Sequence, residues 1–163
     1  MIAWADQNDP RLDVLFDSLQ STSDVQEGVF LTEQIWQRWR EIEDPGVAGL
    51  LSEGITAMGT NDLTAALDYF NQVVGRVPEF AEGWNKRATV YYLMGDYERS
   101  ITDIRETLLR EPRHFGAIAG FGWILLHQGD FTMAEHVLRK ALSVNPFLVD
   151  VRRQLRALMD RRG

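Results

Sequence analysis

Apolar residues recur along most of this chain at the three- and four-residue spacing of helices with one buried face. The pattern is clearest over residues 81–94 and 97–110, and it predicts two consecutive helices there. Gly95 can adopt the left-handed backbone conformation that commonly ends a helix, and Asp96 is a good N-cap for the next helix. The stripe of the second helix consists of Tyr97, Ile101, Ile104 and Leu108. This segment is therefore predicted to be an antiparallel helical hairpin.

The same hairpin pattern recurs along the chain at a fixed period. Pro112 lies midway between Pro78 and Pro146, and the same step maps Gly95 and Asp96 onto Gly129 and Asp130. A repeat of this kind cannot cover its own apolar faces, so it must stack on its neighbours. The period predicts three hairpins, over residues 47–80, 81–114 and 115–148.

The repeats resemble the tetratricopeptide repeat family in period and in residues. In the middle repeat the matching positions are Trp84, Ala88, Tyr91, Gly95, Tyr97, Ser100, Ile104 and Pro112. In the next they are Ile118, Gly122, Leu125, Gly129, Phe131, Ala134, Leu138, Ala141 and Pro146. The first repeat departs at its turn, where Asn61 replaces the glycine; Asn tolerates the left-handed conformation, so we still expect a turn. The resemblance implies an all-α, right-handed α-solenoid of antiparallel helix hairpins.

Segments outside the repeats are expected to extend the solenoid at both ends. Residues 1–10 are assigned to a flexible N-terminus and residues 11–46 to an irregular helical pair that caps the first repeat. One face of that pair is predicted to hold Val25, Val29, Thr32, Trp36 and Trp39, with Ile35 and Ile42 beside it. Residues 149–163 are assigned to a C-terminal capping helix with an inner stripe of Leu148, Val151, Leu155 and Leu158. Its outer face carries Asp150 and five arginines, at positions 152, 153, 156, 161 and 162.

Charge narrows the class of partner. The chain has a net charge of −7, and residues 1–80 hold 4 Lys and Arg against 14 Asp and Glu. An acidic surface does not favour nucleic acid, and no apolar run is long enough to span a membrane. The sequence has no cysteine, which excludes disulfides and thiolate metal sites.

Ala3-Trp4-Ala5 has the small-x-small form of a signal-peptidase site, so we expect a periplasmic protein, with the cytoplasm as the alternative.

No group of residues predicts catalysis. The three histidines, His114, His127 and His136, lack the spacing of a metal site, and no nucleophile or phosphate-loop motif occurs. We therefore expect no enzyme activity, no metal and no cofactor.

The resemblance implies a concave groove lined by the first helix of each hairpin. Carried onto this sequence, the groove residues that we select are Asn85, Lys86, Thr89, Tyr92, Trp123, His127 and Arg153. Trp123 falls outside the packing positions of its hairpin, and Gly116, Ala119 and Gly120 are expected to leave room beside it. These features predict an interaction scaffold that binds a peptide or partner segment in the groove. The alternative is self-association, through the N-terminal helices or through head-to-tail charge pairing.

Overall fold

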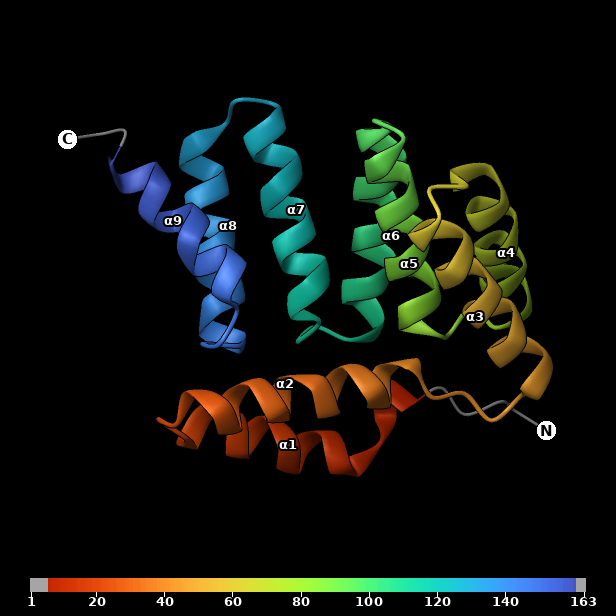
Figure 1. Cartoon of the computed structure of the whole chain (residues 1–163), viewed down its shortest axis with the longest axis horizontal. Helices are drawn as coiled ribbons and strands as arrows, with labels where there is room; N and C mark the ends of the chain where they lie inside the picture. The colour runs from red at the N-terminus through yellow and green to blue at the C-terminus, as the bar shows by residue number, and fades with distance from the viewer. Residues whose placement is uncertain (1–5, 161–163) are drawn as a thin grey trace. The chain divides into compact units, whose positions relative to one another are not determined.

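The computed structural model describes residues 6–160, and every regular element in that range is helical (Figure 1). This confirms the all-α repeat fold. The elements are the 3-10 helix η1 (Asp6–Asn8) and the α-helices α1 (Pro10–Ser21), α2 (Val25–Arg40), α3 (Pro45–Gly59), α4 (Leu63–Arg76), α5 (Ala81–Leu93), α6 (Tyr97–Arg110), α7 (Phe115–His127), α8 (Phe131–Val144) and α9 (Val149–Asp160). None of these helices is long and apolar enough to cross a membrane.

The turn inside each hairpin is built the same way three times. An aspartate caps the second helix, and its carboxylate accepts a hydrogen bond from the backbone N–H three residues later. The capping residues are Asp62, Asp96 and Asp130. The residue before each cap has a positive φ: 62° at Asn61, 79° at Gly95 and 80° at Gly129. Asn61 therefore adopts the left-handed conformation expected of it, and the three turns follow one another at the repeat period.

The described chain divides into two compact units, and the first comprises residues 6–9 and 37–112. Within it, α3 packs on α4 and α5 on α6 as hairpins, and α4 packs on α5. Small residues allow this approach: a Cβ on Gly54 would lie 2.5 Å from the ring of Phe70. The apolar core of this unit is formed by Val47, Leu51, Ala66, Phe70, Val73, Val77, Phe80 and Val90.

An arginine joins the two repeats of the first unit. Arg87 on α5 makes a bidentate pair with Asp103 on α6, at 2.7 and 2.8 Å, and donates to Asn71 Oδ1 on α4 at 3.0 Å. The Asp103 carboxylate holds the pKa of Arg87 above its usual range, mainly through these hydrogen bonds. The guanidinium groups of Arg87 and Arg110 each lie 4.9 Å from the centroid of the Trp84 ring, as cation–π contacts.

Part of the expected flexible N-terminus belongs to the same unit. Gln7 is buried; its amide donates to the Glu79 carbonyl at 2.6 Å and accepts from the N–H of Ala81. Residues 6–8 are therefore held as η1 rather than left flexible. Ala3-Trp4-Ala5 and residues 161–163 lie outside the described residues.

The second unit comprises residues 10–36 and 113–160 of the described chain. Helices α7 and α8 form its hairpin, and α9 packs on α8 (Figure 1). A Cβ on Gly122 would lie 2.5 Å from Leu138 Cδ2, so glycine permits the close crossing of α7 and α8. Val151, Leu155 and Leu158 on α9 are buried, which confirms most of the predicted stripe, and Leu148 is half-buried.

Within the second unit, α1 and α2 pack on the third repeat. Trp36 lies edge-on to His114 and Phe115 at 5.4 and 5.3 Å between centroids, and the Asn145 amide donates to Thr32 Oγ1 at 3.0 Å. We expected this helical pair to cap the first repeat, but these contacts place it on residues 113–147.

The expected apolar face of α2 is partly wrong. Val25 and Val29 are 60% and 49% exposed, whereas the buried positions of the helix are Gly28, Leu31, Ile35 and Trp39. The reason is Gly28, where a Cβ would overlap the ring of Phe147. The helix face that carries Gly28 therefore packs on the third repeat, and the face that carries Val25 and Val29 does not.

Candidate functional site

The repeat period relates the first helix of each hairpin to the same positions on α9. Asn85 on α5, Ala119 on α7 and Arg153 on α9 are equivalent, as are Thr89, Trp123 and Ala157. We call this series the inner register. The selected residues of α5 belong to the first unit and those of α7 and α9 to the second, so each surface is described separately.

On α5, a buried glutamate engages two of the selected residues. Asn85 Nδ2 donates to Glu82 Oε2 at 2.9 Å, and Lys86 Nζ lies 3.1 Å from Glu82 Oε1. Glu82 is only 1% exposed, and Asn85 is also buried. Their spacing of three and four residues puts all three groups on one helix face. Glu82 therefore offsets the positive charge of Lys86 within the helix itself. The sequence signals this role of Glu82, because Lys86 follows it by four residues.

The other two selected residues of α5 are half-buried. The Thr89 hydroxyl donates to the Asn85 carbonyl at 2.9 Å, which uses its O–H donor within the helix and leaves its methyl group and its oxygen lone pairs for contact with a partner. Tyr92 lies 5.8 Å from Tyr97 between ring centroids. Burial raises the pKa of Tyr92, and the neighbouring Tyr97 adds to this, so its phenol is neutral at physiological pH.

On α7, Trp123 is half-buried and His127 is exposed, whereas the hairpin packing positions Ile118, Gly122 and Leu125 are buried as expected. The room expected beside Trp123 is smaller than the glycines suggested. A Cβ on Gly116 would overlap Trp36, whose Cζ2 would be 2.9 Å away, and Ala119 is buried. Trp36 of α2 therefore fills the space at Gly116. A small residue at the start of a helix can allow close packing of another helix as well as access of a ligand.

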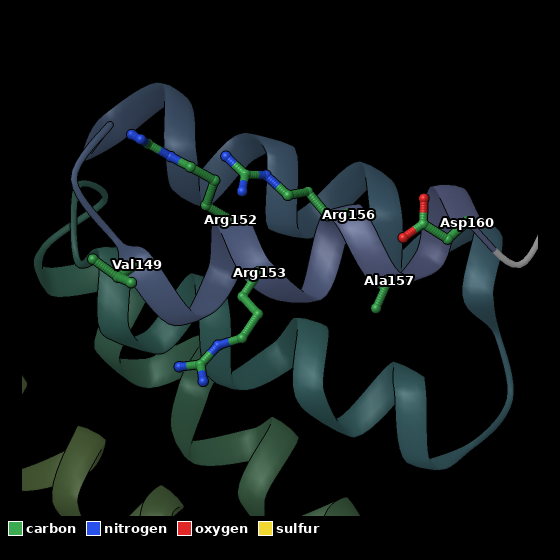
Figure 2. Close-up of a pocket in the computed structure, with 6 residues that line it drawn as sticks. All are labelled: Val149, Arg152, Arg153, Arg156, Ala157 and Asp160. Atoms are coloured by element: carbon green, nitrogen blue, oxygen red, sulfur yellow. The ribbon is translucent and has the colours of Figure 1, made fainter.

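On α9, Arg153 borders a hollow of about 580 Å³ (Figure 2). The other lining residues are Val149, Arg152, Arg156, Ala157 and Asp160. Figure 2 shows Arg153 and Ala157 extending from one side of the helix and Arg152 and Arg156 from the other. Sequence reasoning placed Arg152 and Arg156 only on the outer face of a cap. The signal that groups them is their spacing: Arg152 is one residue before Arg153, Arg156 is three residues after it, and Arg152 and Arg156 are four residues apart.

In residues 6–160, no three His, Asp or Glu side chains gather where they would hold a metal ion. His114 instead caps α7, with Nδ1 accepting from the N–H of Ala117 at 3.1 Å. His127 and His136 are exposed on α7 and α8.

Stacked two-helix repeats with capped turns define a helical repeat protein. A profile of the tetratricopeptide repeat family matches residues 51–106 and 85–148. A TPR repeat-containing protein of Rhizobium etli is 32% identical over 136 residues, which are 83% of this chain and 67% of that protein. The chain belongs to the tetratricopeptide repeat family.

Solved structures share the fold at lower identity. The first TPR of Spaghetti (RPAP3), bound to an HSP90 peptide, superposes with a TM-score of 0.65 at 14% identity, over 71% of this chain and 91% of that one. The type III secretion chaperone SycD of Yersinia enterocolitica, in complex with a peptide of the translocator YopD, gives 0.66 at 14% identity, over 74% and 98%.

Proposed function

We propose that this protein is a non-catalytic interaction scaffold that holds a peptide or partner segment against the inner register of its repeats. The observation that carries the proposal is the half-buried Trp123, which stands in that register but outside the packing positions of its own hairpin. A large aromatic side chain that the core does not use is a typical anchor for a bound chain. The Spaghetti and SycD structures, both with a bound peptide, have the same fold and support this function.

A peptide library tests the proposal without knowledge of the natural partner. Peptides are selected from a random phage-displayed library against the whole chain, and their dissociation constants are measured by titration calorimetry. We expect Trp123→Ala to weaken the selected peptides at least tenfold while the helical circular dichroism signal is retained. The matched control is Leu109→Ala, which removes a side chain that is 70% exposed on α6. It should change affinity less than twofold.

Two results would refute the proposal. One is a folded Trp123→Ala variant that binds every selected peptide like the wild type. The other is loss of helicity in that variant, because Trp123 would then be a core residue.

Self-association is a second candidate, favoured by the exposed apolar side chains of the α1–α2 pair. Val14, Val25 and Phe30 are 66%, 60% and 62% exposed. Light scattering at several salt concentrations tests this candidate. Association through apolar side chains should persist in high salt and disappear in Phe30→Glu, whereas charge pairing should weaken as salt is added.

A further inference from the structure

The rotation of α9 is set by its buried stripe. Val151, Leu155 and Leu158 are at most 5% exposed, so the positions between them must face outward. Arg152, Arg153 and Arg156 are all exposed there, around the hollow shown in Figure 2. The volume of this hollow, about 580 Å³, lies within the usual range for ligand pockets.

The arginines of the hollow are weakly engaged by the protein itself. Arg153 pairs with Asp150, but the two side chains are 74% and 78% exposed. A pair that exposed to solvent contributes little stability, so another carboxylate can replace Asp150 at little cost. Arg152 donates to the carbonyl of Pro146. Arg156 has no ion-pair partner among the residues that the structure describes.

The chemistry of the lining favours carboxylates on a peptide. Guanidinium groups bind carboxylates through two parallel hydrogen bonds, a geometry that lysine cannot offer. Val149 and Ala157 border the same hollow and provide apolar contact for an aliphatic side chain. Nucleic acid also carries negative charge, but it binds through many phosphate contacts over an extended basic surface, which a chain with a net charge of −7 does not favour. A short peptide needs only the few arginines around the hollow.

We infer that the hollow on α9 binds a peptide segment rich in aspartate and glutamate, whose side-chain carboxylates pair with Arg153 and Arg156. Because Arg153 belongs to the inner register, this inference rests on the proposed function and names the chemistry of the partner segment that contacts α9. An aliphatic residue of the segment contacts Val149 and Ala157.

The probe is a fluorescein-labelled decapeptide of glutamate and leucine whose C-terminus is amidated, so that every carboxylate belongs to a side chain. Fluorescence anisotropy with the whole chain in low salt gives the dissociation constant. We expect binding that weakens at least tenfold when glutamine replaces glutamate in the peptide. The double variant Arg153→Gln/Arg156→Gln should weaken binding of the glutamate peptide equally. Arg105→Gln, which removes an exposed arginine from α6, is the matched control and should change it less than twofold.

The outcomes separate this inference from the proposed function. If library-selected peptides bind in a Trp123-dependent way but the glutamate peptide does not bind, or binds the double variant unchanged, only the inference is refuted. If neither kind of peptide binds, both are refuted. A concentration-dependent dimer that the double variant abolishes would show that a second copy occupies the hollow, which also overturns the inference.

Discussion

Trp36 of α2 lies against Gly116 at the start of α7, in space that any side chain at residue 116 would need. The same indole packs edge-on to His114 and Phe115. An aromatic ring cannot bend aside, so the glycine is a condition for docking of α2 on the third repeat.

Gly116→Ala should therefore lower the free energy of unfolding by about 1–3 kcal/mol, because overpacking forces the ring or the helix to move. Urea denaturation measures this. Introduced into the Trp36→Ala variant, Gly116→Ala should lower the free energy of unfolding by at least about 1 kcal/mol less than it does in the wild type. Gly49→Ala is the control: a Cβ there meets nothing within 4 Å, and alanine should stabilise α3 by up to about 1 kcal/mol. Additive effects of Trp36→Ala and Gly116→Ala would contradict the steric argument.

His114 has two separable roles, as the N-cap of α7 and as a ring beside Trp36. His114→Ala removes both, whereas His114→Asn keeps an acceptor for the Ala117 N–H. The asparagine variant should be more stable than the alanine variant by about 1 kcal/mol, and both should be less stable than the wild type. Thermal or urea unfolding gives the difference. Equal stabilities of the two variants would show that the cap contributes nothing.

The pair between Arg87 and Asp103 is largely buried, with side-chain exposures of 17% and 3%. Arg87→Met leaves the Asp103 carboxylate buried without its counter-charge, so we expect a loss of about 3 kcal/mol. The control is Arg99→Met, which breaks an i,i+3 pair with Asp96 whose arginine and aspartate side chains are 66% and 29% exposed, and it should cost only a small fraction of that loss. Comparable losses in the two variants, measured by urea denaturation, would argue against burial as the cause.

Asn61 occupies the turn position that Gly95 and Gly129 occupy in the other repeats, with a φ of 62°. Asn61→Gly should leave the unfolding free energy within about 0.5 kcal/mol of the wild type, because glycine has no Cβ to strain. Asn61→Val should lose about 1–2 kcal/mol, since a β-branched side chain is poorly tolerated at positive φ. Thermal unfolding of the two variants gives both values, and a valine variant as stable as the glycine variant would exclude strain at this turn.

The repeats were predictable because each of their determinants is local. Helix periodicity, an aspartate cap and a residue with positive φ all act within a few positions, and the chain repeats them at a constant interval, at Asp62, Asp96 and Asp130. The sequence also identified the packing positions Ile118, Gly122 and Leu125, since these follow the same period. Stacking then follows, because one hairpin alone cannot bury its apolar faces.

The surroundings of the candidate residues were decided by tertiary structure. The exposure of Val25 and Val29, and the filling of the space at Gly116, depend on how α2 docks on residues far away in the sequence, such as Asn145 with Thr32. Contacts at that separation follow neither the helical period nor the repeat period. The sequence by itself determined the helices and their pairing into hairpins. Only the tertiary structure decided which surfaces remain open, because exposure depends on every segment that packs nearby and not on a residue's own position in its helix.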